Sequence, residues 1–362
     1  MTAAWARRRT RERVEVVGGV DTHKDTHTAA VIDTAGRLLG SAQFAADPAG
    51  YRALLAWLQG WGTLQLVGVE GTGVYGAGLA RFLAEQPVAM VEVDRPDRKA
   101  RRRQGKSDPV DAEAAARAAL GRVRTGVPKQ RDGQVEALRA LRIARRSAVS
   151  QRADTQRQIK ALIVTAPEPL RGQLRGLGDR QLLQACAALR PDRARAADPS
   201  TATKIALRSL ARRHQALSAE VAELDQLLAP LVAAINPALL EIHGVGVEIA
   251  GQLLVTAGQN SQRLTSEAAF AMLCGAAPIP ASSGKTHRHR LNRGGDRQAN
   301  SALWRIAITR MRTDPRTKNY VARRTREGLS KPEIIRCLKR YLARELFAAL
   351  TTPTPQQHAL AA

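Results

Sequence analysis

The chain has 362 residues, which is long enough for two or three domains that each bury a core. Its 57 lysines and arginines outnumber 32 aspartates and glutamates, for a formal net charge of +25. This excess is spread along most of the chain, so it indicates a polyanionic partner, nucleic acid above all. Aromatic residues make up 3% of the chain, which argues against base stacking as the main mode of binding.

Several classes of protein are excluded by what the sequence lacks. The three cysteines, Cys186, Cys274 and Cys337, lie far apart and form no CxxC pair, so neither a disulfide framework nor a zinc knuckle is expected. No segment has the apolar length of a membrane span, and the Arg-rich start has no apolar signal core. We therefore expect a cytoplasmic protein with no membrane partner.

Residues 14–125 alternate strand and helix patterns and are predicted to form one α/β domain. Asp47 and Pro48 are start signals for a helix over residues 47–59. "LQLVGVE", ending at Glu70, is a continuous apolar run of the kind found in buried parallel strands. Three hairpin-linked strands followed by alternating helix and strand indicate a sheet with an antiparallel edge. The predicted strands are residues 14–21, 27–33, 37–44, 64–70 and 87–93, with a second helix over 76–86.

The remainder of the chain is predicted to be mainly α-helical, which makes the fold class α/β plus α. Residues 130–235 carry apolar residues at steps of three and four, typical of long antiparallel helices or coiled-coil arms. A third domain is expected over residues 238–350, ending in a helix with an apolar stripe through Ile334, Leu338, Tyr341, Leu342 and Leu346. Residues 351–362 are expected to be a disordered tail.

Four acidic residues fall where such a fold gathers functional groups. Asp21 and Glu70 end two predicted strands, and ligand sites of α/β sheets lie at the carboxyl ends of strands. Asp108 and Asp111 are three residues apart at a helix start, so both side chains face one way. Together the four carboxylates are suited to one or two Mg²⁺ ions, with Mn²⁺ as an alternative, that clamp a phosphodiester during cleavage.

Simpler explanations exist for some of these residues taken alone. Asp108 before Pro109 is a good helix N-cap, and Asp111 in the first turn is favoured by the helix dipole. Only the arrangement of all four residues favours metal binding over capping. Four histidines also invite a zinc site, but no cysteine accompanies them and we expect none. They are His23, His27, His287 and His289.

Two segments are candidates for binding the nucleic-acid backbone. "LLEIHGVGVEIAGQLLVTAG" resembles a helix-hairpin-helix, whose Gly244 and Gly246 turn would present backbone N–H groups to a phosphate. An ordinary turn between helices explains it equally well. The segment from 95 to 106 has seven cations and one acid, Asp97, next to the acidic residues. Its cations are Arg95, Arg98, Lys99, Arg101, Arg102, Arg103 and Lys106.

Three long stretches carry a resemblance to a known family. "VGGVDTHKDTHTAAVIDTAGRLLG", "VGVEGTGVYGAGLARFL" and "VDRPDRKARRRQGKSDPVDAEAAARAAL" closely resemble the DEDD transposases of the Piv-related insertion-sequence family. "LCGAAPIPASSGKTHRHRLNRGGDRQANSALWRIAI" resembles that family's C-terminal transposase domain. The resemblance implies an RNase H-like (RuvC-like) N-terminal domain, and it places the family's acidic tetrad on the four residues above.

The resemblance also implies a serine nucleophile that forms a phosphoserine link to DNA. The candidates are Ser282 and Ser283, and the distance to "LNRGGD" fits the family slightly better from Ser282. A Ser-Ser-Gly segment is otherwise an ordinary loop. The cations that follow are expected to hold the scissile phosphate. They are Lys285, Arg288, Arg290 and Arg293.

The sequence therefore predicts a Mg²⁺-dependent DNA transposase or recombinase that acts on donor and target DNA. By resemblance it would be guided by a bridge RNA that supplies sequence choice through base pairing. Two DNA molecules must be held together, so a homo-oligomer, a dimer or tetramer joined through the helical arms, is expected. Two alternatives stay open: a RuvC-like Holliday-junction resolvase or nuclease without a covalent intermediate, and a non-catalytic nucleic-acid-binding protein.

Overall fold

A computed structural model describes residues 14–94, 107–285 and 289–352. The predicted basic segment 95–106, Arg288 and His287, and most of the predicted tail lie outside the described residues. The chain divides into two compact units, Met1–Arg131 with Ala257–Thr265 and Asp132–Thr256 with Ser266–Ala362. The finer division at 14–125, 130–235, 238–350 and 351–362 stays a prediction.

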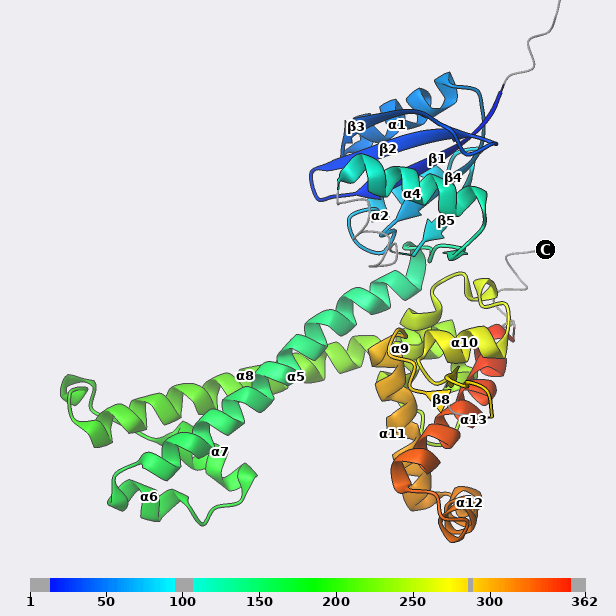
Figure 1. The fold of residues 1–362 in the computed structure, drawn as a ribbon. Coiled ribbons are helices and arrows are strands. Elements are labelled where there is room, and N and C mark those ends of the chain that lie inside the picture. The colour runs from blue at the N-terminus through cyan, green and yellow to red at the C-terminus, as the bar shows by residue number, and fades with distance from the viewer. Residues whose placement is uncertain (1–13, 95–106, 286–288, 353–362) are drawn as a thin grey trace, which may run out of the picture. The chain divides into compact units, whose positions relative to one another are not determined.

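The first unit contains a six-stranded sheet in the order β3-β2-β1-β4-β5-β6 (Figure 1). The central pairs β1–β4 and β4–β5 are parallel, and the outer pairs β1–β2, β2–β3 and β5–β6 are antiparallel. This confirms the predicted mixed α/β sheet with an antiparallel edge, which is compatible with an RNase H-like domain. The strands are β1 (Glu15–Thr22), β2 (Thr26–Asp33), β3 (Leu38–Ala45), β4 (Thr63–Glu70), β5 (Ala89–Val93) and the unpredicted β6 (Thr125–Gly126).

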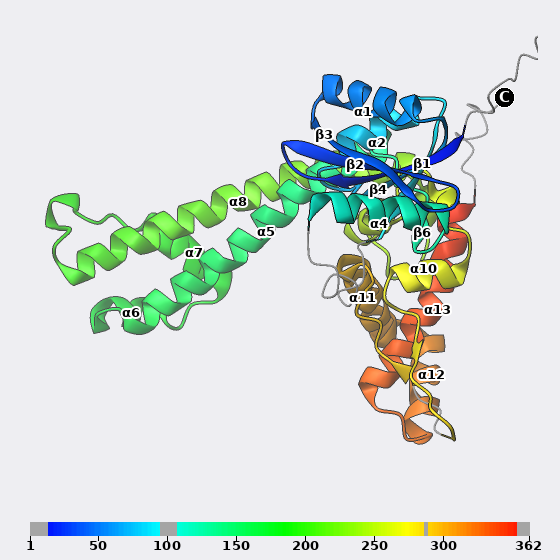
Figure 2. The ribbon, with the colours of Figure 1, turned by 45° about the horizontal axis from the view of Figure 1, so that its top comes forward.

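Helices cover both faces of this sheet. Figure 2 shows α1 (Pro48–Gly60) on one side and α4 (Asp108–Leu120) on the other. Alternate residues of β1 separate the two layers, because Val16 and Val20 pack in the core with α1 and α2 (Ala77–Ala84), whereas Val17 packs with α4. The predicted start of α1 is confirmed: the Asp47 side chain accepts a hydrogen bond from the Gly50 N–H at 2.8 Å.

Helix α4 lies unusually close to the sheet because two strand residues have no side chain. A Cβ atom on Gly19 would stand 2.1 Å from the Ala116 backbone nitrogen, and one on Gly68 would stand 2.7 Å from the Ala115 carbonyl oxygen. The side chains on the helix face that is turned to the sheet are correspondingly small, because this face consists of buried alanines at steps of three and four. They are Ala112, Ala115, Ala116 and Ala119.

A segment from far along the chain joins the first unit. Residues 257–265 belong to this unit by their contacts. The Asn260 side chain accepts a hydrogen bond from the Gln130 N–H at 3.1 Å and donates one to the Pro128 carbonyl at 3.0 Å. No sequence pattern indicated this return of the chain.

The second unit is helical, as predicted. Helices α5 (Gly133–Thr165) and α8 (Pro199–Ile235) lie side by side in both views (Figures 1 and 2). Helix α8 ends at Ile235, at the end of the range 130–235 for which long helices were predicted, and the coiled-coil character of the pair stays a prediction. The other elements are α6 (Glu168–Leu174), α7 (Asp179–Ala188), α9 (Val247–Ala257), α10 (Glu267–Leu273), β7 (Ile279–Pro280), β8 (His289–Arg290), α11 (Arg297–Thr313), α12 (Pro315–Arg326) and α13 (Lys331–Thr351).

Two predictions for the last part of the chain need correction or stay open. In α13, Ile334, Leu338, Leu342 and Leu346 are buried as expected, but the Tyr341 side chain is 56% exposed and does not belong to the stripe. The helix-hairpin-helix expected over residues 239–258 is not confirmed, because residues 240–246, which precede α9, form turns and not a first helix. Among the described helices, none has the length and apolarity that a membrane crossing requires.

The close packing of α4 predicts a specific loss of stability. Gly19→Ala is expected to lower the free energy of unfolding by about 1–3 kcal/mol, because the new methyl group meets helix backbone that must move away. Gly60→Ala in α1 is the matched control, since a Cβ there meets nothing within 4 Å. Urea unfolding measures both, and equal stability of the two variants would contradict the packing described.

Candidate active site

Two acidic residues are neighbours where parallel strands β1 and β4 end. Val20 stands opposite Val69, so Asp21 and Glu70 follow as the next pair and point to the same face as Gly19 and Gly68, the face that α4 covers. The Thr22 hydroxyl donates a 2.8 Å hydrogen bond to the Glu70 carbonyl and ties the two strand ends together. Asp21 and Glu70 are both buried, with exposed fractions of 8% and 7%.

The first turn of α4 brings two more carboxylates toward this face. Asp108 is the first residue of the helix and is partly exposed, whereas Asp111 is buried with an exposed fraction of 4%. Ser107 occupies the N-cap position, and its side chain makes no capping hydrogen bond. The capping explanation is therefore wrong for Asp108, whose carboxylate contacts His23 instead.

His23 joins the two aspartates that come from different elements. Its Nε2 lies 3.1 Å from Asp21 Oδ2 and 3.3 Å from Asp108 Oδ1. From the sequence this histidine was a candidate only for zinc, and its place beside Asp21 was not predicted. The available signal was its position two residues beyond Asp21, because side chains two apart on an extended chain point to the same side.

The surroundings of Asp21 disfavour the ionised form of its carboxyl group. Burial raises the pKa of Asp21, His23 lowers it, and the negative charges of Asp111 and Asp108 raise it again, so that the net direction is upward. A cation bound among these side chains would offset the repulsion and favour ionised carboxylates.

The donor set suits a divalent cation. Asp21, His23 and Asp108 each offer one ligand atom, and these atoms lie within 4.8 Å of one another. Among the described residues, neither Glu70 nor Asp111 belongs to this group, whose ligand atoms all lie within 4.8 Å of one another. Carboxylates suit Mg²⁺ and Mn²⁺, whereas an imidazole also suits softer metals, so the residues indicate a divalent ion without selecting which.

His27 lies on the other side of the sheet from this cluster. It is fully buried and stacks on Tyr51 of α1, with ring centroids 5.6 Å apart. Burial lowers the pKa of His27. Its role is therefore packing in the α1 layer.

The two candidate serines lie on an exposed loop in the second unit. Strands β7 and β8 form a short antiparallel pair, with Ile279 opposite Arg290, and the loop between them carries Ser282 and Ser283. Lys285, Arg290 and Arg293 are exposed on the same segment. We call residues 281–285 the serine loop.

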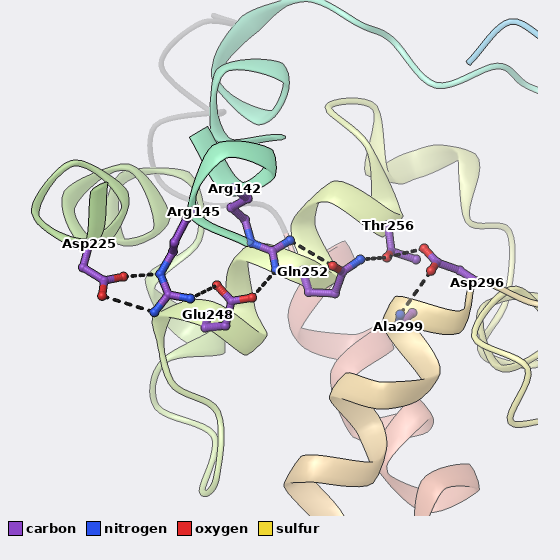
Figure 3. Close-up of polar contacts among 8 residues, drawn as sticks. All are labelled: Arg142, Arg145, Asp225, Glu248, Gln252, Thr256, Asp296 and Ala299. Carbon is purple, nitrogen blue, oxygen red and sulfur yellow. Dashed lines mark hydrogen bonds and ion pairs between the residues drawn. The ribbon is translucent and has the colours of Figure 1, made fainter. Parts of the chain in front are cut away.

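A chain of polar contacts holds the end of the segment that follows the serine loop. Asp296 accepts a hydrogen bond from the Gln298 N–H at the start of α11. It also accepts hydrogen bonds from the Ala299 N–H and, at 2.8 Å, from the Thr256 hydroxyl (Figure 3). Gln252, in turn, donates to that hydroxyl at 3.1 Å. The contacts then continue through Arg142 to Glu248, and through Arg145 to Asp225, which links α11, α9, α5 and α8.

The Gly244–Gly246 turn lies at the start of α9. Gly244 has a φ of +86°, which a residue with a side chain rarely adopts, and Gly246 has open space where a Cβ would be. Helix α9 begins at Val247, directly after the turn. The turn can therefore offer N–H groups at a helix start, while its contact with a phosphate stays a prediction.

Comparisons with known proteins agree with this description at both ends of the chain. Residues 18–166 match the model of the DEDD transposase domain of IS110 elements, described as "Transposase". Residues 236–322 match a model described as "Transposase IS116/IS110/IS902 family". The chain thus carries IS110-family DEDD transposase domains.

Two curated relatives come from insertion elements. The chain is 34% identical over 149 residues to the "Insertion element IS110 uncharacterized 43.6 kDa protein" of Streptomyces coelicolor, a match that covers 40% of this chain and 36% of the relative. It is 27% identical over 144 residues to the "Insertion element IS900 uncharacterized 42 kDa protein" of Mycobacterium paratuberculosis, covering 39% and 36%. Each match spans about a third of the relative's length.

The acidic cluster predicts metal binding that depends on Asp21. Asp21→Asn is expected to weaken Mn²⁺ binding by at least about tenfold, because the variant loses one charged ligand of the cluster. Asp25→Asn, an exposed acid in the adjacent β1–β2 turn, is the matched control. Isothermal titration calorimetry on the full chain measures both, and an equal effect of the two changes would exclude this site.

The raised pKa of Asp21 predicts how stability depends on pH without metal. The folded pKa lies above the ordinary value of 3.8, so the folded state holds the proton more tightly than the unfolded state. This contribution is fully present below pH 3.8 and is lost as the pH rises through the folded pKa. With a chelator present, Asp21→Asn should unfold at higher urea than the wild-type chain near neutral pH and converge with it in acid. A constant difference across this range would contradict the raised pKa.

Proposed function

We propose that this protein is an insertion-sequence transposase, a DNA recombinase that cuts and rejoins strands with the help of Mg²⁺ or Mn²⁺. The observation that carries the proposal is the meeting of Asp21 and Asp108 with His23 on one face of a mixed sheet. It gains support from the transposase models matched by both parts of the chain. The formal charge of +25 suits a partner as anionic as DNA.

Asp21, Glu70, Asp108 and Asp111 are the proposed metal-binding residues of this function. A bound divalent ion supplies charge stabilisation at the phosphodiester being cut. The residues themselves keep the ion beside the strand ends, because α4 is fixed against Gly19 and Gly68. His23 holds the Asp21 and Asp108 carboxylates together through contacts of 3.1 and 3.3 Å.

Ser282 or Ser283 is the proposed nucleophile. Its Oγ attacks the phosphorus of a DNA strand, the bond from phosphorus to a deoxyribose oxygen breaks, and that oxygen takes up a proton while the serine loses its own. Attack by a strand-end hydroxyl on the phosphoserine then joins the strands and restores the serine. The exposure of both side chains is compatible with this chemistry.

The partners are part of the same proposal. A structured bridge RNA would choose the DNA sequences by base pairing, while the protein contacts backbones through its arginines and lysines. The proposed cationic contacts include residues 95–106, which the structure does not describe, and the exposed Lys285, Arg290 and Arg293. A homo-oligomer would hold the two DNA molecules together.

The serine mechanism is tested by trapping. The wild-type chain, incubated with donor and target DNA, is expected to form a protein–DNA adduct that survives denaturation. The adduct should disappear in one of the variants Ser282→Ala and Ser283→Ala, together with strand exchange. Ser266→Ala, which alters the cap of α10 outside the serine loop, is the control. Strand exchange that persists in the double variant Ser282→Ala/Ser283→Ala would favour a metal-dependent resolvase.

The metal-binding residues are tested in the same reaction. Asp21→Asn is expected to lower strand exchange at least about a hundredfold, because charge that develops in the transition state is no longer compensated. Asp25→Asn should retain activity. Full activity of Asp21→Asn would favour a binding protein whose carboxylates have no catalytic part.

A further inference from the structure

A pocket of about 720 Å³ lies between helix α13 and the segments on both sides of the serine loop. One wall consists of residues 275–278, before β7, and residues 289–292, which include β8. The opposite wall is α13 together with Leu329, and Figure 1 shows β8 beside α13. We call this space the α13 pocket. Its volume is typical of sites for a small ligand.

The α13 pocket is strongly cationic. Arg336, Lys339 and Arg340 follow one another at steps of three and one, so that they share one side of the helix, and Arg290 of β8 also lines the pocket. Glu333 is the carboxylate among the described lining residues. It is already engaged at the start of α13, where it accepts hydrogen bonds from the N–H and hydroxyl of Ser330. Four cations therefore line the pocket together with one carboxylate, Glu333, which also lies 3.9 Å from Arg336.

The hydrogen bonds of these cations are incomplete among the described residues. Lys339 Nζ donates to the neutral amide oxygen of Asn300 at 2.9 Å. Arg340 Nη2 pairs with Glu267 at 2.9 Å, but its Nη1 is buried with no hydrogen-bond partner. Burial, and then the charge of Arg336, lower the pKa of Lys339. An anion in the pocket would offset the positive charge that Arg336, Lys339 and Arg340 bring together there.

The pocket is also connected to the serine loop. The Asn300 amide that accepts from Lys339 donates to the carbonyls of Cys274 and Gly275, at 2.9 and 3.1 Å. These carbonyls begin the segment that leads into β7 and the loop. A ligand on Lys339 would therefore be held by the same residues that fix the base of this segment.

We propose that the α13 pocket binds one nucleotide of a single DNA strand, with its phosphate held by Arg336, Lys339 and Arg340. The inference deepens the proposed function and rests on it, since the occupant would be the strand presented to the serine loop. A pocket of this volume takes a nucleotide but not a duplex. Tyr341 and Leu291, both exposed at its rim, offer an apolar surface for the base.

The test measures binding of a short fluorescein-labelled single-stranded DNA to the full chain by anisotropy over a range of salt concentrations. Arg336→Gln is expected to weaken binding about tenfold and to lower the slope of log K against log salt by about 0.7, the value for one lost phosphate contact. Arg336→Lys, which keeps the charge, should restore most of the slope. Circular dichroism melting checks that each variant is folded.

Arg157→Gln on α5 is the matched control. Arg157 is also an exposed helical arginine with a carboxylate three residues earlier, Asp154, so the variant removes the same charge from a similar setting outside the pocket. Equal losses for Arg336→Gln and Arg157→Gln, or none for Arg336→Gln, would overturn the inference. The inference would also be overturned if Arg336→Gln weakened binding of an RNA oligonucleotide of the same sequence but left binding of the DNA unchanged.

The outcome is separable from that of the proposed function. Asp21→Asn should bind the labelled strand as the wild-type chain does, while it fails in strand exchange. If Arg336→Gln binds DNA normally while Asp21→Asn still loses strand exchange, the pocket inference is wrong and the proposed function stands. Strand exchange that survives Asp21→Asn removes the proposed function whatever the pocket binds.

Discussion

The close contact between α4 and two glycines is the constraint on which the candidate metal site depends. Any side chain at Gly19 would meet the backbone of α4 at 2.1 Å, and the helix would have to lift from the sheet. With glycine there, the first turn of α4 comes close enough for Asp108 to reach His23 and for the charge of Asp111 to act on Asp21. The close contact between Gly19 and α4, two residues before Asp21, thus fixes the position of carboxylates that lie almost ninety residues further along the chain.

Each unit contains a cluster of like charges that neighbouring side chains offset only in part. In the first unit, burial and neighbouring carboxylates raise the pKa of Asp21. In the second, the half-buried Lys339 lies near the charge of Arg336, and Arg340 pairs with Glu267 but keeps one buried donor without a partner among the described residues. Like charges held together cost stability in the free protein, so such clusters favour a ligand of opposite charge. A divalent cation and a DNA phosphate are the two ligands that these clusters suit.

The serine loop combines exposed side chains with fixed ends. Asn300 holds the Cys274 and Gly275 carbonyls at its N-terminal side, and Asp296 caps α11 on the other. Through Thr256 and Gln252, Asp296 also joins the contacts that reach Arg142 on α5. The loop is therefore anchored to the helices of the second unit, which suits the nucleophilic role proposed for one of its serines.

Local patterns in the sequence determined the kinds of element and much of the acidic site. Alternation and apolar runs predicted the mixed sheet, and strand ends at Asp21 and Glu70 pointed to one edge, because these signals depend on neighbours along the chain. The sequence did not determine which side chains touch. Tertiary packing decided that His23 lies beside Asp108, that residues 257–265 return to the first unit, and that the cations of α13 face β8. Such contacts join residues that are distant in sequence, and no local period carries information about them.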